Sequence, residues 1–186
     1  MRVVKRSGGE RRERKGIRPK ESGFTVTELA ITMGILSILI GLGAASFDRL
    51  MGKYRAESEI RTFHADLLQA RFFAMQKNKV HFFEVKSGPP STYQLYEDTN
   101  ESGGSSPDEG DTALWQSPKL LDCAPAWYGT LILDPRGVVK TDASSLTSNL
   151  SIAFNVGPAD PEYDCLQVNA MRIKLGRKNG KTCEPR

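Results

Sequence analysis

One uninterrupted apolar segment constrains the fold of this chain more than any other feature. Residues 29–47 are 19 consecutive residues without a charged side chain. At about 1.5 Å per residue, a helix of this length extends roughly 29 Å, close to the ~30 Å hydrocarbon core of a bilayer. The 186-residue chain as a whole is polar, with a mean hydropathy of -0.40. The sequence therefore predicts a single transmembrane helix and excludes a polytopic membrane protein.

Positive charge is concentrated before the apolar segment. Residues 1–23 contain nine Lys or Arg and three acidic residues, whereas residues 24–186 contain 17 basic and 19 acidic residues. By the positive-inside rule, this asymmetry keeps the amino terminus in the cytoplasm and sends the carboxyl-terminal part outward. One interpretation is a cleaved secretory signal peptide, cut at the small residues 44–46, which releases a soluble protein starting near Phe47.

Two features favour a different interpretation. The uncharged segment is longer than the roughly 7–15 residues of a signal-peptide core. In addition, Glu28 places a carboxylate at the start of the apolar segment, where an acid costs about 2–3 kcal/mol on insertion scales and needs a partner. A cut between Gly23 and Phe24 creates that partner, because the new amine on Phe24 is a cation at the same depth.

The sequence Gly23-Phe24-Thr25-x-x-Glu28 before an apolar helix resembles the processing site of type IV pilins and type II secretion pseudopilins. The resemblance implies that prepilin peptidase, a membrane aspartyl peptidase, cuts after Gly23 and methylates the amine of Phe24. It also implies that Glu28 pairs with the amine of a neighbouring subunit and sets the register of a helical filament.

The same resemblance predicts the domains, partners and location of the chain. Residues 1–23 are a cleaved basic leader, residues 24–54 the transmembrane helix segment and residues 55–186 a periplasmic domain. The expected partners are other pilins or pseudopilins through the amino-terminal helix, prepilin peptidase, an inner-membrane assembly platform and, before assembly, membrane lipid. The expected location is the inner membrane, single-pass with a cytoplasmic amino terminus, and a filament after assembly.

The helix is expected to continue beyond the membrane and to end near Asn78. Apolar residues recur there at spacings of three and four, which is a helical stripe: Ile60, Phe63, Leu67, Ala70 and Ala74. Three further apolar residues are expected to widen it: Leu68, Phe72 and Met75. Polar residues are expected to fill much of the opposite face: Glu57, Glu59, Arg61, Asp66 and Gln69. This second half of the helix is therefore amphipathic, and we expect the carboxyl-terminal part of the chain to pack on it.

After the helix, short β-prone segments alternate with turn residues. The candidate strands are residues 80–85, 93–96, 113–116, 130–133, 138–140, 150–156 and 166–175. One long helix and then several short strands predict an α+β domain, with the helix packed on antiparallel sheet. The order LLQARFFAMQKNKVHFFEV, LWQ, LDPRG and a basic carboxyl end resembles the GspH/FimT-type minor pseudopilins.

The cysteines fit an oxidising compartment beyond the membrane. Cys165 and Cys183 flank the last predicted strand, and a disulfide between them contributes about 3 kcal/mol. Cys123 is then left over, although three cysteines allow three single pairings and the sequence does not choose among them. Zinc is not expected, because there is no C-x-x-C and the two histidines, His64 and His81, have no paired spacing. Both histidines are predicted to be surface or half-buried residues.

An acidic loop at residues 98–111 matches the calcium-loop pattern D-x-N-x-S-G-x5-E. The matching residues are Asp98, Asn100, Ser102, Gly103 and Glu109. Their oxygens are ligands that Ca²⁺ prefers. The flanking segments are strands rather than the helices of an EF-hand, and Pro107 interrupts the ligands. A solvated acidic hairpin is the alternative, so Ca²⁺ is the one cofactor considered.

Basic residues cluster at the carboxyl end. The candidate nucleic-acid contacts are Arg172, Lys174, Arg177, Lys178 and Lys181. Such a cationic turn contacts phosphates without reading bases. FimT-like relatives in natural transformation resemble this end in having a glycine-arginine motif for DNA capture, so a DNA-binding minor pilin is the alternative function. A solvated charged hairpin is the structural alternative.

The sequence contains no motif that favours an enzyme. It contains no G-x-S-x-G, no P-loop, no dinucleotide fingerprint and no metal-ligand cluster. No catalytic residues are predicted, and the reaction at Gly23 and Phe24 is one performed on this chain. We therefore expect a structural subunit, a minor pseudopilin, rather than an enzyme.

Overall fold

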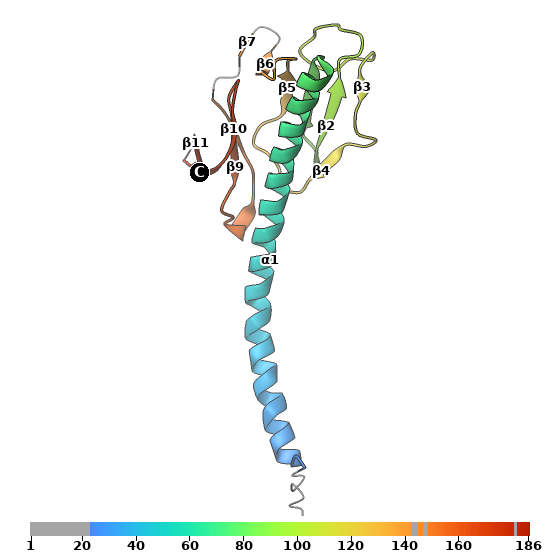
Figure 1. Ribbon diagram of the computed structural model, residues 1–186. Helices are drawn as coiled ribbons and strands as arrows, with labels where there is room; N and C mark the ends of the chain where they lie inside the picture. Colours follow the sequence, from blue (N-terminus) through green and yellow to red (C-terminus); the bar gives the residue numbers. More distant parts are fainter. Residues whose placement is uncertain (1–22, 143–144, 147–148, 181) are drawn as a thin grey trace, which may run out of the picture. The chain divides into compact units, whose positions relative to one another are not determined.

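The computed structural model describes residues 23–142, 145–146, 149–180 and 182–186. Apart from Gly23, the predicted leader at residues 1–23 lies outside the described residues. The chain divides into two compact units, residues 1–42 and 43–186. Within the described part, one long helix, α1 (Val26–Lys77), precedes all of the strands (Figure 1). The predicted α+β class is confirmed.

In the first unit, the described residues form the beginning of α1. Its apolar side chains are exposed all round the helix, with Ile40 and Leu42 each 69% exposed. Among the described residues, α1 is the one helix long and apolar enough to cross a bilayer, by length and composition. A helix that is apolar on every face needs a bilayer or other apolar helices around it.

In the second unit, the rest of α1 lies against two antiparallel sheets. The larger sheet has the order β3-β2-β1-β5-β6-β7, with β4 also paired to β2. Its strands are β1 (His81–Lys86), β2 (Ser91–Glu97), β3 (Thr112–Ala113), β4 (Lys119–Leu121), β5 (Gly129–Leu133), β6 (Val139–Asp142) and β7 (Ser145–Leu146). The smaller sheet has the order β11-β10-β9-β8. Its strands are β8 (Leu150–Ala153), β9 (Cys165–Val168), β10 (Ile173–Asn179) and β11 (Thr182–Pro185), and a 3-10 turn, η1 (Gly157–Ala159), comes after β8.

The predicted apolar stripe of α1 forms the centre of the core. All five of its members are completely buried: Ile60, Phe63, Leu67, Ala70 and Ala74. The ring of Phe63 contacts Phe83 on β1, Tyr93 on β2 and Phe154 just after β8, with ring centroids 5.3, 5.0 and 5.4 Å apart. One helix side chain thus joins both sheets.

The prediction that Leu68, Phe72 and Met75 widen this stripe is wrong. Their side chains are 39%, 56% and 44% exposed. Each residue along a helix turns it by about 100°, so Leu68 points well away from its buried neighbour Leu67. The sheets cover one stripe of α1, and these three residues lie outside it.

Two carboxylates assigned to the solvent face are buried, which corrects the prediction for Glu57 and Asp66. Glu57 accepts a 2.7 Å hydrogen bond from the backbone N–H of Glu162. Asp66 accepts hydrogen bonds from the Tyr93 hydroxyl and the Lys119 ammonium, both 2.7 Å long. Burial of these charges is offset because each has a partner on a segment that packs against the helix.

The helix ends at Lys77, next to the predicted Asn78. Asn78 adopts the left-handed conformation, with φ 51°. The N–H of Lys79 then bonds back to the carbonyl of Ala74 over 3.3 Å. This is the closing hydrogen bond of a Schellman motif, which asparagine tolerates at that position.

The strand predictions differ from the structure mainly near the carboxyl end. The single strand predicted at 166–175 is a hairpin, because Asn169 and Arg172 exchange backbone hydrogen bonds of 2.8 and 3.3 Å and reverse the chain. β11 was not predicted, nor were the short β4 and β7. The segment predicted at 113–116 pairs only as β3, and β8 stops at Ala153 rather than at residue 156.

Candidate functional site

The candidate processing site lies immediately before α1. Gly23 and Phe24 precede the first helical residue, and the Phe24 side chain is 79% exposed. Within residues 23–142 and the later described ranges, no heavy atom lies within 4 Å of the position where a Cβ would stand on Gly23.

Thr25 and Glu28 form the start of the helix. Thr25 Oγ1 accepts a hydrogen bond from the Glu28 N–H, 3.2 Å long, and the Thr25 carbonyl accepts one from Leu29. This is the backbone half of a capping box. A carboxylate in the first turn is stabilised by the helix dipole, by about 0.3–1 kcal/mol. The Glu28 carboxylate is exposed and has no ion pair among the described residues.

A second exposed surface runs along the helix beside the folded domain. We call Ala65, Leu68, Phe72 and Met75 the outer stripe of α1. All four are exposed, and they are separated by three, four and three residues. This is the spacing at which one helix packs along another. The spacing of these residues is visible in the sequence, but the sequence does not show that the sheets leave them exposed.

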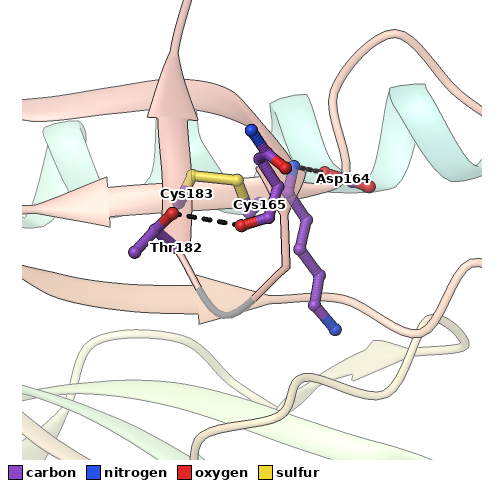
Figure 2. The surroundings of a disulfide bond; sticks show 6 residues. Asp164, Cys165, Thr182 and Cys183 are labelled. Carbon is purple, nitrogen blue, oxygen red and sulfur yellow. Dashed lines mark hydrogen bonds between the residues drawn. A yellow bond between two sulfur atoms is a disulfide. The ribbon is translucent and has the colours of Figure 1, made fainter.

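The predicted disulfide between Cys165 and Cys183 is present (Figure 2). It joins β9 to β11 across β10, where Gly176 lies between them. A Cβ on Gly176 would stand 2.4 Å from the Glu184 carbonyl oxygen and 2.8 Å from Cys183 Sγ. Glycine is therefore required where the β11 backbone and the disulfide come close to β10.

The basic candidates at the carboxyl end do not share one surface. Side chains alternate along β10, and its register places Ile173 and Arg177 on the core side of the sheet. Arg177 forms an ion pair with Asp160. Lys174 and Lys178 alternate to the outer side and are exposed, as is Arg172 in the turn just before β10. Lys181 lies outside the described residues.

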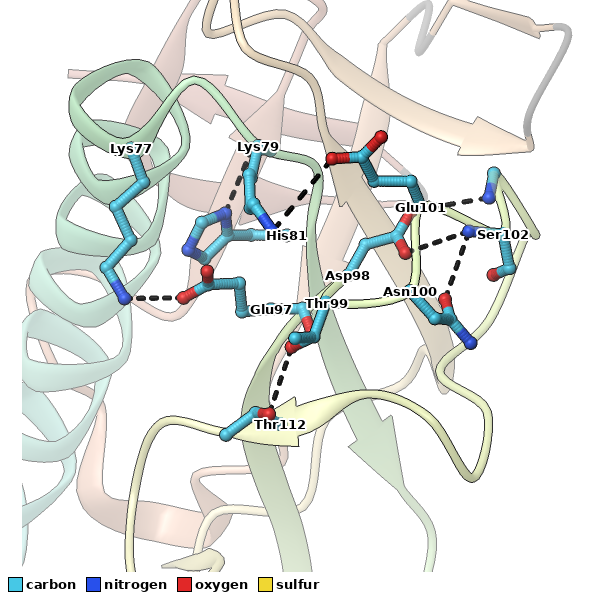
Figure 3. A network of polar contacts seen from close by, with 11 residues as sticks. Lys77, Lys79, His81, Glu97, Asp98, Thr99, Asn100, Glu101, Ser102 and Thr112 are labelled. Carbon is cyan, nitrogen blue, oxygen red and sulfur yellow. Dashed lines mark hydrogen bonds and ion pairs between the residues drawn. The ribbon is translucent and has the colours of Figure 1, made fainter.

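The acidic loop is organised by its own hydrogen bonds (Figure 3). Asp98 is buried, and its carboxylate accepts the N–H groups of Ser102 and Gly103 at 3.1 and 3.3 Å. Asn100 accepts the same Ser102 N–H at 3.0 Å and donates to Asp108. Glu109 is exposed and takes no part in these bonds.

These contacts engage the side-chain oxygens of Asp98 and Asn100, two of the residues that the calcium prediction requires. Within the described residues, no group of three His, Cys, Asp or Glu side chains is placed to hold a metal ion. The calcium site stays a prediction without a geometric argument in its favour.

The two histidines lie apart in the fold. His64 on α1 contacts the carbonyl of Ile173 at 3.3 Å. His81, at the start of β1, is completely buried, so the prediction that it is a surface or half-buried residue is wrong. Its Nδ1 lies 3.1 Å from the Lys79 carbonyl, close to the ion pair between Lys77 and Glu97 (Figure 3). Burial lowers the pKa of His81, which keeps the ring neutral.

Cys123 is a free, half-buried thiol. Its backbone N–H donates to the Glu59 carboxylate at 3.1 Å. Burial, together with that carboxylate, raises the thiol pKa to about 12. The thiolate is the reactive form, so Cys123 stays protonated and unreactive at neutral pH.

Comparison of the chain with protein-family models, with curated proteins and with solved structures finds no match. The architecture itself is pilin-like, with a long apolar amino-terminal helix packed on antiparallel sheet.

Proposed function

We propose that this chain is a minor pseudopilin, a structural subunit of a type II secretion or type IV pilus filament. The observation that carries the proposal is the division of α1. Its first part is apolar on every exposed face, and its second part is covered by sheets on one side only. A helix of this kind is incomplete in a monomer, because both parts leave apolar surface uncovered.

In the proposed cycle, the subunit is stored in the inner membrane through the apolar segment at residues 29–47. Prepilin peptidase cuts between Gly23 and Phe24 and methylates the new amine. The assembly platform then moves the subunit into a filament, where the apolar helices pack against one another. The outer stripe of α1 receives a neighbouring helix, and Glu28 pairs with a neighbouring amine.

Mass analysis of the membrane-extracted protein tests the first step. The expected mature chain starts at methylated Phe24. A soluble form starting near Phe47 would instead identify a cleaved signal peptide and end the proposal.

Glu28→Gln tests the pairing with the neighbouring amine. The variant keeps the size of the side chain and leaves the Thr25 cap in place, so the helix loses only about 0.3–1 kcal/mol of dipole interaction. We expect normal peptidase processing and a strong loss of the subunit from sheared filaments. Thr27→Ala, a first-turn change without loss of charge, is the matched control. Equal incorporation of Glu28→Gln and wild type contradicts the pairing.

A second function, capture of DNA, is favoured by one observation. Arg172, Lys174 and Lys178 lie on the outer side of one hairpin without an ion pair among the described residues. Three cations, two on β10 and one just before it, fit the spaced charges of a phosphate backbone.

A gel shift of the full chain with duplex DNA distinguishes the two functions. If DNA binds, Lys174→Glu/Lys178→Glu abolishes the shift, whereas Arg177→Glu has less effect because Asp160 already neutralises that residue. The absence of a shift at low salt removes the DNA function and leaves the filament proposal untouched.

A further inference from the structure

A groove lies beside α1 just after the apolar segment ends. Its floor is the helix itself at Gly52 and Ala56, and one wall is formed by Val156, Pro158 and Ala159 around η1. The other wall is formed by residues 122–123. The groove has a volume of about 570 Å³, which falls in the range of small-molecule sites, about 300–1,000 Å³.

Two helix carboxylates fix the walls. Glu57 holds the backbone of Glu162 beyond η1, and Glu59 holds the backbone of Cys123. Gly52 faces η1, since a Cβ built on it would stand 3.9 Å from the Ala159 side chain, an ordinary van der Waals contact. The groove is therefore built by specific contacts between the helix and two loops.

The rim of the groove carries charges of both signs. Arg49 and Arg55 line it, together with Asp48, Glu59 and Asp122. Among the described residues, neither arginine has an ion-pair or hydrogen-bond partner. An adjoining hollow of about 400 Å³ shares Arg55, Glu59 and Asp122 and includes the exposed Leu120 in its wall. Two unpaired guanidinium groups next to carboxylates suit a ligand that carries both a phosphate and an ammonium.

The position of the groove relative to the apolar segment indicates that such a ligand comes from the membrane surface. Asp48 comes directly after Phe47, the last residue of the uncharged segment. Along the helix, Arg49 lies about 3 Å and Arg55 about 12 Å beyond Phe47. If residues 29–47 span the hydrocarbon core, these arginines stand at the depth of the phospholipid headgroups and just outside them.

We infer that this groove binds the headgroup of a phosphatidylethanolamine molecule in the outer leaflet while the subunit is stored in the membrane. Arg49 and Arg55 bind the phosphate. The ammonium lies among the carboxylates of Asp48, Glu59 and Asp122. The inference rests on the membrane anchoring in the proposed function and adds a ligand that no part of that proposal requires.

The composition of the groove selects among lipids. An ethanolamine ammonium has three N–H donors for the carboxylates, whereas a choline has none. Quaternary ammonium groups are held by aromatic rings, and none of the described residues lining the groove is aromatic. A purely anionic headgroup meets the carboxylates without an ammonium to offset them. The expected order of affinity is phosphatidylethanolamine above both phosphatidylcholine and phosphatidylglycerol.

Native mass spectrometry of the full chain tests this order. The chain is inserted into nanodiscs of equal phosphatidylethanolamine, phosphatidylcholine and phosphatidylglycerol, then extracted in mild detergent, and the retained lipids are counted. We expect the wild type to retain phosphatidylethanolamine. Arg49→Gln and Arg55→Gln should each reduce this retention about tenfold, because each variant loses one charge-assisted hydrogen bond. Asp122→Asn should shift retention from phosphatidylethanolamine towards phosphatidylglycerol.

Lys53→Gln is the matched control, because Lys53 lies on the same stretch of helix, pairs with Glu57 and does not line the groove. Equal retention of the three lipids by wild type overturns the inference, as does equal loss in Lys53→Gln and Arg49→Gln/Arg55→Gln. Displacement of the lipid by inorganic phosphate as readily as by glycerophosphoethanolamine would identify a phosphate site instead.

Processing is measured in the same membrane fraction. A chain that is inserted in the membrane and starts at Phe24 but shows no lipid preference contradicts only the inference that the groove binds a lipid. A soluble chain that starts near Phe47 overturns both the groove and the filament proposal.

Discussion

Phe63→Ala and Phe72→Ala remove the same side chain from two faces of α1, and the pair separates folding from assembly. Phe63 is completely buried, and its ring contacts three aromatic rings at centroid distances of 5.0–5.4 Å. Phe72 is 56% exposed. We expect Phe63→Ala to unfold the domain readily and Phe72→Ala to fold normally but assemble poorly.

The magnitudes depend on burial. Truncating a buried phenylalanine costs about 3–5 kcal/mol, and an aromatic pair adds about 0.5–1.5 kcal/mol beyond area. With three such pairs, the upper end is expected, and Phe63→Ala should lower the free energy of unfolding by about 4–5 kcal/mol. Phe72→Ala should change it by about 0.5 kcal/mol or less, as at an ordinary surface site.

Urea unfolding of the full chain in detergent, monitored by tryptophan fluorescence, measures the free energy of unfolding. Trp115 is a suitable reporter, because its ring lies 5.6 Å from Tyr93 and 6.1 Å from Phe83, within the cluster around Phe63. The fraction of each variant in sheared filaments measures assembly. The reasoning is refuted if Phe72→Ala destabilises the domain as much as Phe63→Ala, or if Phe72→Ala assembles as well as wild type.

Two further predictions concern the sheets. Gly176→Ala should destabilise the domain by about 1–3 kcal/mol, because its Cβ would overlap the Glu184 carbonyl and Cys183 Sγ. The comparison in a urea titration is Gly104→Ala, whose Cβ would meet no atom closer than 3.4 Å. Burial lowers the pKa of His81 below 6.5, so the unfolded chain binds its proton more readily. Stability is therefore full above about pH 6.5 and falls as the pH drops towards the folded pKa. The urea midpoint should decrease when the pH is lowered from about 7.5 to about 5.5, and His81→Gln should make that decrease smaller. An equal decrease in both proteins would contradict the role given to His81.

Local pattern was sufficient to predict α1 and its buried stripe. Ile60, Phe63 and Leu67 recur at helical spacing, and the side chains at that spacing always share a face. The end at Lys77 was equally local, because Asn78 accepts the left-handed conformation that closes the helix. The pairing of Cys165 with Cys183 was one of several that the spacing permits, and the register of β9, β10 and β11 selects it.

Long-range contacts decided the features that local pattern left open. In the sequence, Asp66 has the position of a solvent-facing residue. In the structure it is buried, because Tyr93 and Lys119, on strands far along the chain, bind its carboxylate. Arg177 and Lys178 are adjacent cations in sequence, yet strand alternation gives them opposite sides and Asp160 neutralises only Arg177. Such partners depend on strand register and on turns, which a one-dimensional pattern does not encode.

The residues of α1 by themselves determine a membrane-length apolar helix that continues as an amphipathic one. Which of its apolar side chains remain uncovered is decided only when the sheets fold, because two sheets bury one stripe and Phe72 lies beyond their reach. The groove beside Arg49 and Arg55 likewise exists only after two distant loops bind Glu57 and Glu59, since a cavity is a relation between segments and not a property of any one of them.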